Sequence, residues 1–320
     1  MAISTYQKGL QDLGGGCSAW MQPDGSWGWS NAGLITGAGC SLLIDTLFDL
    51  PCTRDMLRAM TAITQRNPIT TVVNTHSDGD HYFGNQLVAG PGVEIIASEA
   101  AAERMNQEAV EEIVALTRHI GPLGDWVRKI FGPFDFEGIE STGPTLTFSG
   151  KHQLDVGGRE VQLIQVGPAH TSGDTIVYVP DAKTLYTGDI LFIGGTPIVW
   201  AGPPQRWVDA CELILDLDVS AIVPGHGPVT DKSGVCQVRD YLTYLISEVT
   251  KRFEDGADVD TTILSLSQGD YANLPDSSRV VQNVVSVYQA LSGDAVKLGR
   301  VDIFERMAAL EGFTGDGMKR

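Results

Sequence analysis

The chain has 320 residues, of which 42% are hydrophobic and 19% are charged, so it can bury a sizeable core. Its 40 acidic and 22 basic side chains give a formal net charge of -18, and such a surface repels nucleic-acid phosphates and anionic lipids. No apolar run approaches the roughly 20 residues of a membrane span, and the N-terminus lacks the pattern of a secretory signal. We therefore expect neither a nucleic acid nor a membrane as partner.

The five cysteines are scattered along the chain and form no CxxC motif. They are Cys17, Cys40, Cys52, Cys211 and Cys236. An odd number of dispersed cysteines is typical of free thiols in a reducing compartment, where most of them act as small buried apolar residues. The sequence therefore indicates a cytoplasmic location.

Short apolar runs, rich in β-branched residues and bounded by glycine, proline or aspartate, predict buried strands. They occupy residues 32–37, 41–46, 70–75, 93–98, 145–150, 161–166, 175–180, 184–189 and 220–225. The GAG segment between the first two runs predicts a hairpin. Helical stretches such as residues 54–66 alternate with the runs, so the pattern predicts an α/β fold in which helices cover the sheets.

Two segments depart from this alternation. Residues 99–143 hold a helical run followed by a stretch rich in aromatic and turn-forming residues. This insertion could cap a pocket, or it could simply pack against the domain without a functional role. After residue 231 the strands stop and three apolar helical faces follow. These faces carry Val238, Tyr241, Leu242, Leu245, Ile246 and Val249, then Val281, Val284, Val285, Tyr288 and Leu291, then Ile303, Phe304 and Met307. We therefore expect an α/β domain over residues 1–230 and a C-terminal helical appendage over residues 231–320, which could cover the core or pair two copies into a homodimer.

Four of the six histidines lie in turn-like contexts directly after predicted strands. His76 and His81 belong to NTHSDGDH, His170 to VGPAHTSGD and His226 to VPGHGP, and Asp189 in YTGDILF also ends a strand. One such histidine alone would more often be a hydrogen-bonded structural residue. Four in the same context, with aspartates beside them, favour a site where strand ends converge at one edge of a sheet.

The complete ordered set is His76, Asp78, Asp80, His81, His170, Asp189 and His226. In this order and spacing it resembles the metallo-β-lactamase superfamily over roughly residues 30–230. The resemblance implies a four-layer αβ/βα sandwich with a dinuclear metal site along one edge. It also matches Asp45, in LLIDT, to the aspartate of the family's first motif, which supports the structure or a ligand.

Carried over by position, the resemblance implies two groups of ligands around two divalent ions. One ion would be held by His76, Asp78 and His170 and the other by Asp80, His81 and His226, with Asp189 bridging both. Imidazole and carboxylate ligands suit zinc, the expected metal, as well as iron or manganese. The family usually has histidine where this chain has Asp78, and the extra carboxylate favours harder ions, while its shorter reach could leave the first ion loosely held. Gly79 is expected to permit an unusual backbone twist in this loop.

A water molecule between two such ions loses a proton near neutral pH and becomes a nucleophile. The resemblance implies that Asp80 orients this nucleophile and shuttles its proton. We therefore predict a metal-dependent hydrolase that cleaves an ester, thioester or lactone of a small, partly apolar molecule. Asp78 keeps two alternatives of the same fold open, a diiron oxygenase or redox enzyme and a phosphodiesterase, although the acidic surface disfavours large nucleic-acid substrates. A non-catalytic binding protein is the remaining alternative.

Several side chains near the motifs could support the site. Thr171 and Asp174 could orient His170 or merely cap its loop. Trp27, Trp29 and Trp200 could line the substrate pocket. The tryptophan-rich N-terminal stretch could equally be a packed ribbon.

Overall fold

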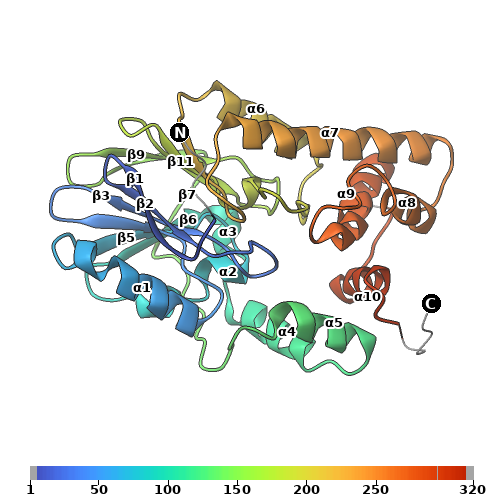
Figure 1. The fold of residues 1–320 in the computed structure, drawn as a ribbon, viewed down its shortest axis with the longest axis horizontal. Helices are drawn as coiled ribbons and strands as arrows, with labels where there is room; N and C mark the ends of the chain where they lie inside the picture. The colour runs from blue at the N-terminus through green and yellow to red at the C-terminus, as the bar shows by residue number, and fades with distance from the viewer. Residues whose placement is uncertain (1–5, 294, 315–320) are drawn as a thin grey trace.

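The computed structural model describes residues 6–293 and 295–314, and its centre is a pair of β-sheets with helices on their outer sides (Figure 1). The first sheet consists, in chain order, of β1 (Gly9–Gly14), β2 (Cys17–Met21), β3 (Ala32–Thr36), β4 (Ser41–Ile44), β5 (Ile69–Val73), β6 (Glu94–Ser98) and β7 (Leu146–Phe148). The second sheet has the order β12 (Ala221–Val223), β11 (Thr184–Tyr186), β10 (Thr175–Val179), β9 (Glu160–Gln165) and β8 (Lys151–Asp155). These two sheets with their helices confirm the predicted α/β sandwich.

The strand directions bring distant loops to one edge. Strands β4 and β5 are parallel, with Ile44 opposite Val73, so the loops that follow them begin side by side. Strands β11 and β12 are also parallel, with Tyr186 opposite Val223. Because the carboxyl ends of parallel strands meet at the same edge of a sheet, each pair delivers two neighbouring loops to that edge.

The central strands are apolar on both faces because both faces are covered. In β3, the neighbouring residues Leu34 and Ile35 point to opposite sides, the first toward the helix α1 (Leu50–Thr64) and the second toward the other sheet. Helix α1 begins four residues earlier than the predicted stretch because the Asp49 carboxylate accepts a hydrogen bond from the Cys52 N–H and caps the helix. Helix α6 (Gln205–Asp216) covers the second sheet in the same way, through Trp207 among others.

The remaining helices lie in the insertion, next to the motif loops and at the C-terminal end. They are α2 (Gly79–Tyr82), η1 (Asn85–Leu87), α3 (Glu99–Ala102), α4 (Gln107–Thr117), α5 (Pro122–Phe131), η2 (Gly188–Ile190), α7 (Lys232–Glu254), α8 (Val259–Leu266), η3 (Ser277–Arg279), α9 (Val280–Ser292) and α10 (Arg300–Leu310). Within the described residues, none of the helices combines the length and the hydropathy that a bilayer span requires.

Each of the nine predicted runs contains a strand, and the hairpin of β3 and β4 is confirmed. Strands β1, β2 and β8 were not predicted from the sequence. Strands β1 and β8 are edge strands whose sequences, GLQDLG and KHQLD, carry polar residues on both faces, so they lack the apolar signal of a buried strand. The tryptophan-rich stretch begins within β2, which pairs with β1, and its Trp20 is buried.

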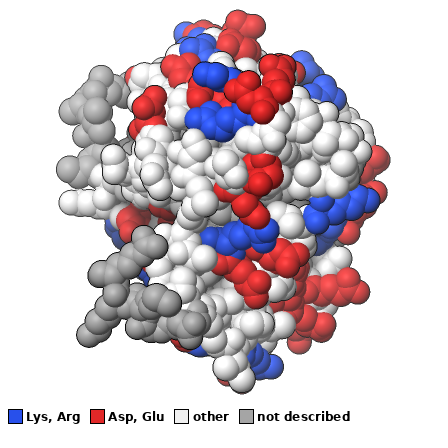
Figure 2. All heavy atoms as spheres, turned by 90° about the vertical axis from the view of Figure 1, so that its right-hand side faces the viewer, with Lys and Arg blue, Asp and Glu red and all other residues white. Residues whose placement is uncertain are grey.

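The C-terminal helices pack closely on the rest of the chain. Helix α7 lies against α6, α9 lies against α7, and α10 lies against α5 of the insertion (Figure 1). Of the residues on the predicted apolar faces, Leu291 is exposed, because it lies in the last turn of α9. Figure 2 views the side of the molecule where the C-terminal helices lie and shows acidic and basic side chains interspersed. The boundary at residue 230 and the homodimer remain predictions.

Candidate metal centre

The four motif histidines converge at the shared sheet edge, and a hydrogen bond fixes the Nδ1 atom of each ring. The Nδ1 partners are Thr75 Oγ1 at 3.0 Å for His76, Asp45 Oδ2 at 2.8 Å for His81, the Ile198 carbonyl at 2.7 Å for His170 and the Gly25 carbonyl at 3.0 Å for His226. A carbonyl oxygen only accepts, so Nδ1 of His170 and His226 carries the proton and the neutral ring keeps a free lone pair on Nε2. The surroundings therefore leave the Nε2 atoms for a shared centre.

The Asp189 carboxylate occupies this centre. It follows β11, is nearly fully buried and lies within 4 Å of the Nε2 atom of every motif histidine. Its Oδ1 lies 3.0 Å from His81, and its Oδ2 lies 3.8, 3.4 and 3.3 Å from His76, His170 and His226. A Cβ atom at Gly225 would overlap Asp189 Oδ1, so the glycine leaves room for the carboxylate.

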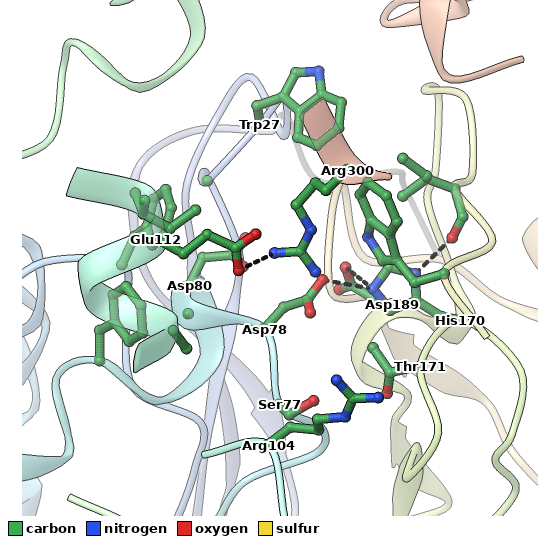
Figure 3. Close-up of a pocket in the computed structure, with 18 of the residues that line it drawn as sticks. Trp27, Ser77, Asp78, Asp80, Arg104, Glu112, His170, Thr171, Asp189 and Arg300 are labelled. Carbon is green, nitrogen blue, oxygen red and sulfur yellow. Dashed lines mark hydrogen bonds and ion pairs between the residues drawn. The ribbon is translucent and has the colours of Figure 1, made fainter. Parts of the chain in front are cut away.

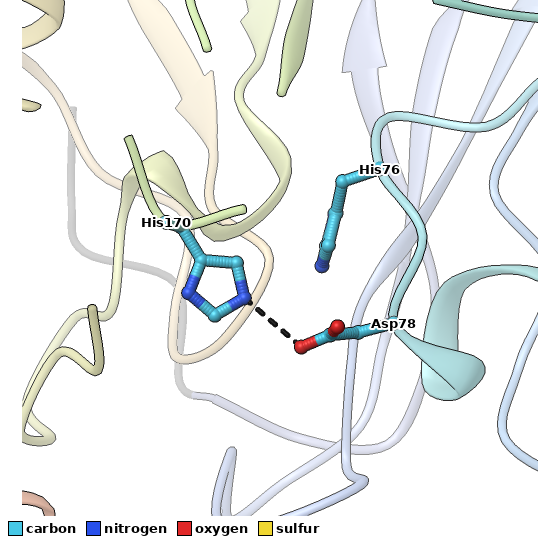
Figure 4. A group of neighbouring side chains, drawn as sticks. All are labelled: His76, Asp78 and His170. Atoms are coloured by element: carbon cyan, nitrogen blue, oxygen red, sulfur yellow. Dashed lines mark hydrogen bonds and ion pairs between the residues drawn. The ribbon is translucent and has the colours of Figure 1, made fainter. Parts of the chain in front are cut away.

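The two other aspartates of the motif pair with different histidines. Asp78 Oδ2 lies 3.1 Å from His170 Nε2, and His76 adjoins this pair (Figure 4). Asp80 Oδ2 lies 3.3 Å from His226 Nε2. The prediction of an unusual backbone twist at Gly79 is wrong, because this residue is the first of α2 and its φ is not left-handed. A side chain there would instead collide with the Phe83 ring.

The donor atoms form three groups in which all ligand atoms lie within 4.8 Å of one another. The groups are His76 with Asp78 and His170, His76 with His81 and Asp189, and Asp80 with His81 and His226. Among the described residues, His76 Nε2, His81 Nε2 and Asp189 Oδ1 are buried and have no hydrogen-bond partner, although the last two atoms are only 3.0 Å apart. Buried polar atoms without partners are costly, and a cation between them would remove this cost, so the donor set fits divalent metal.

Electrostatics in the site lower the pKa of Asp78 and raise those of two histidines. Burial opposes the charge on Asp78, but the hydrogen bond from His170 and the charges of His170, His76 and Arg300 hold its pKa at about 2. Burial also opposes protonation of His170 and His226, yet their carboxylate neighbours raise both pKa values to about 9. Protons therefore occupy these sites when cations do not, as expected of ligands that exchange protons for metal.

Two buried carboxylates support the site without facing its centre. Asp45 accepts hydrogen bonds from the backbone N–H and hydroxyl of Thr75 and from His81, so it ties together the loops after β4 and β5. Asp174 accepts from the backbone N–H and hydroxyl of Thr171 and from the Ala169 N–H. Asp174 thus orders the loop of His170 and does not touch its ring, while burial raises the pKa of Asp174 to about 6.

A cavity of about 340 Å³ adjoins the site, and Asp78, Asp80 and Asp189 are among the residues that line it (Figure 3). Trp27 and Trp200 line this cavity, whereas Trp29 packs on Phe134, with 4.7 Å between ring centroids, and is not one of its walls. The other walls come from both segments that departed from the α/β pattern. Helices α4 and α5 contribute Ile113 and Phe131, and α10 contributes Phe304.

Three arginines and a glutamate of the cavity wall were not anticipated from the sequence. Arg104, Arg279 and Arg300 all line the cavity, and Glu112 on α4 pairs with Arg300. They are charged residues in or beside helices, outside the motifs. The sequence therefore holds no local signal that could have identified them.

Comparison with known proteins agrees with this geometry. Residues 25–226 match a family model described as the metallo-beta-lactamase superfamily. The 2,4-dinitroanisole O-demethylase subunit alpha of Nocardioides sp. and the acyl-coenzyme A thioesterase MBLAC2 of Bos taurus are each 26% identical over 198 residues, 60% of this chain. These matches cover 51% and 67% of the two relatives. The hydroxyacylglutathione hydrolase of Brucella ovis is 33% identical over 99 residues, 31% of this chain and 38% of that protein. The chain thus spans about half the length of the demethylase subunit.

Solved structures show the same fold. The sec-alkylsulfatase Pisa1 from Pseudomonas sp. aligns with a TM-score of 0.65 and 17% identity over 88% of this chain and 50% of its own. A metallo-beta-lactamase from Pontibacter korlensis aligns with a TM-score of 0.55 and 18% identity over 74% of this chain and 99% of its own. Because the family model matches more than half of the residues and the fold agrees, the chain belongs to the metallo-β-lactamase superfamily.

Proposed function

We propose that the chain is a metal-dependent hydrolase that cleaves an ester, thioester or lactone bond in a small, partly apolar molecule. The observation that carries this proposal is the convergence of four fixed imidazoles and three carboxylates beside a cavity. No serine or cysteine nucleophile is needed for such a site. Divalent ions held there would polarise the bond to be cleaved and lower the pKa of a water molecule.

We assign the ligands as the donor groups suggest. His76, Asp78 and His170 would hold one ion, Asp80, His81 and His226 the other, and Asp189 would contact both. Zinc is the expected metal, and the three carboxylates also accommodate iron or manganese. Asp80 lines the cavity, so it would also orient the attacking water and accept its proton.

The cavity supports a small substrate with an apolar part. Its volume suits a molecule of modest size, and its walls include the aromatic rings of Trp27, Phe131, Trp200 and Phe304. Two relatives, the acyl-coenzyme A thioesterase and the hydroxyacylglutathione hydrolase, are named for the cleavage of acyl thioesters. These names favour an acyl bond as the point of attack.

A second candidate is cleavage of an aryl methyl ether. It is favoured by the relative named 2,4-dinitroanisole O-demethylase subunit alpha, together with the aromatic walls of the cavity. The diiron oxygenase and the phosphodiesterase remain alternatives of the same site. Metal identity, the visible absorption spectrum and oxygen consumption separate the redox alternative from hydrolysis.

The test combines metal analysis with a substrate panel of 4-nitrophenyl esters, thioesters, lactones, phosphodiesters and anisoles. Asp80→Ala and His226→Ala should abolish turnover and lower bound metal, because each removes a donor from the second ion. His119→Ala is the matched control, since this exposed histidine lies outside the cavity. Wild-type metal content in both site variants would contradict the ligand assignment, and a colourless, metal-loaded protein that cleaves none of the acyl substrates would contradict the proposed reaction.

A further inference from the structure

The cavity wall is richer in cations than the rest of this acidic protein. Outside the metal donors, the charged residues that line it are Arg104, Arg279 and Arg300 on one hand and Glu108 and Glu112 on the other. Over the whole chain, acidic residues outnumber basic ones by 40 to 22. Arginine in a substrate cavity is well suited to binding carboxylates, because its planar N–H groups match two oxygens.

Arg279 is already committed to the fold. It is 2% exposed, it donates to the Thr196 carbonyl at 2.8 Å, and it pairs with Asp276 at 3.1 Å. Its guanidinium carbon also lies 4.3 Å from the ring centroid of Trp27 and 5.1 Å from that of Phe192. This arginine therefore joins the C-terminal region to the cavity wall. Its guanidinium already has protein partners, so it is a poor candidate for binding a substrate.

Arg300 is placed differently. It is the first residue of α10, and its guanidinium carbon lies 5.4 Å from the Trp200 ring centroid. A guanidinium nitrogen of Arg300 lies 3.0 Å from a carboxylate oxygen of Glu112 on α4. Figure 3 shows its guanidinium reaching over Asp78, and its charge is one of those that lower the Asp78 pKa. The side chain thus extends from the cavity rim toward the metal donors.

The partner of Arg300 is readily exchanged. The two side chains of this ion pair are 44% and 46% exposed, and ion pairs in such positions contribute at most about 1 kcal/mol. In Figure 3, Arg104 lies on the other side of Asp78, and the described part of the chain gives its side chain no ion pair or hydrogen bond. An anion that enters the cavity can therefore take the place of Glu112 and meet a second cation.

We propose that Arg300 binds an anionic group of the substrate, a carboxylate, by exchanging Glu112 for it, with Arg104 adding to the attraction. This inference rests on the proposed hydrolase function and narrows its substrate to a molecule with an anionic group close to the bond that is cleaved. Glu112 then acts as a stand-in for the substrate carboxylate when the cavity holds none.

The test compares two esters with the same reacting bond, mono-(4-nitrophenyl) adipate and its methyl-capped neutral counterpart. The measured quantity is the ratio of their kcat/KM values in the metal-loaded protein. Arg300→Gln should lower this ratio about 10- to 100-fold, through KM, because it removes a charge-assisted hydrogen bond made to bound substrate. Arg300→Lys should restore part of the ratio. Glu112→Gln should raise it by up to about fivefold, because a competing anion is lost.

Arg306→Gln is the matched control, since this arginine lies on the same helix but pairs with Asp260, away from the cavity. It should leave the ratio at the wild-type value. A ratio in Arg300→Gln within twofold of wild type would overturn the proposal.

The binding of unreactive analogues separates this proposal from the hydrolase function. The dissociation constants of adipic acid monoamide and neutral adipamide are measured from the change in tryptophan fluorescence on binding. This signal is expected to respond because Trp27 and Trp200 line the cavity. A preference for the monoamide that disappears in Arg300→Gln supports the carboxylate site even if neither ester is cleaved, in which case only the hydrolase proposal fails. Equal binding of the monoamide by both proteins would show that the carboxylate binds elsewhere, and would overturn the inference about Arg300.

Discussion

The orientation of His170 depends on a buried asparagine in the C-terminal region, and this dependence can be tested. Asn283 on α9 is fully buried, accepts a hydrogen bond from the Val199 N–H at 2.9 Å and donates to the Pro197 carbonyl at 2.8 Å. Between these two residues stands Ile198, whose carbonyl fixes Nδ1 of His170. Asn283 therefore holds the loop segment that orients a proposed metal ligand.

Asn283→Leu keeps the number of non-hydrogen atoms and removes these two hydrogen bonds as well as the one that Asn283 donates to the Tyr241 hydroxyl at 2.8 Å. It leaves the Val199 N–H, the Pro197 carbonyl and the Tyr241 hydroxyl without these partners in a buried place. Each such group costs about 1–3 kcal/mol, so we expect the free energy of unfolding to fall by about 3–9 kcal/mol. Loss of the support for a ligating imidazole typically weakens metal binding about 10- to 100-fold. We therefore expect weaker metal binding as well as lower stability.

Urea unfolding of the metal-free protein measures the first effect, and competition with a chelator of known affinity measures the second. Thr262→Val is the control, because it removes a buried hydrogen bond between α8 and the Tyr288 hydroxyl of α9 without touching the His170 loop. This control should lose about 1 kcal/mol and keep its metal affinity. If Asn283→Leu loses stability yet binds metal as tightly as Thr262→Val, the reasoning that links α9 to His170 is refuted.

Three further outcomes are expected. Gly225→Ala should lower the metal content of both proposed sites while the chain stays folded, because the added methyl group displaces Asp189. Elemental analysis measures the metal content, and circular dichroism checks the fold. The pKa values of His170 and His226 are raised from 6.5 to about 9. Protonation of these two rings therefore stabilises the folded metal-free protein fully below about pH 6.5, and this stabilisation is lost as the pH rises through 9. Since cations compete with these protons, the gain in Tm on adding zinc should grow over that window, and a gain independent of pH would contradict it. Asp78→His should raise zinc retention after dialysis, and lower retention would show that the shorter carboxylate is a well-fitted ligand.

The donor side of the site could be predicted from the sequence because its information is local. The motif around His76 and His81 fills one short loop, and His170, Asp189 and His226 each follow a strand that reads clearly as apolar. The order of the strands brings those loops together. Even so, the carbonyl partners of the imidazoles could not be predicted, since a backbone oxygen leaves no mark in the sequence.

The substrate side could not be predicted for a different reason. Arg300 and Glu112 are separated by most of the chain and are each ordinary for an exposed helix, so only tertiary packing shows that they meet. The tryptophans illustrate the same limit. Trp27 and Trp29 are neighbours in sequence, yet one faces the cavity and the other packs on Phe134, because the path of an irregular loop decides which ring turns inward.

These two sides of the site also differ in how they can change. The proposed metal donors stand on loops that follow β5, β9, β11 and β12, and every imidazole is fixed by a hydrogen bond, so we expect a substitution there to disturb the whole centre. Part of the cavity wall is formed by α4, α5 and α10, which are joined in part by ion pairs near the surface, such as Lys129 with Glu311 at 2.7 Å and Arg300 with Glu112 at 3.0 Å. Exposed pairs contribute little to stability, so the charged residues of these helices can be exchanged at low cost. We therefore expect substrate choice to depend on the helical segments. The C-terminal helices would then act in two ways, because α9 orients a proposed donor while α10 supplies the cation that we propose selects the substrate.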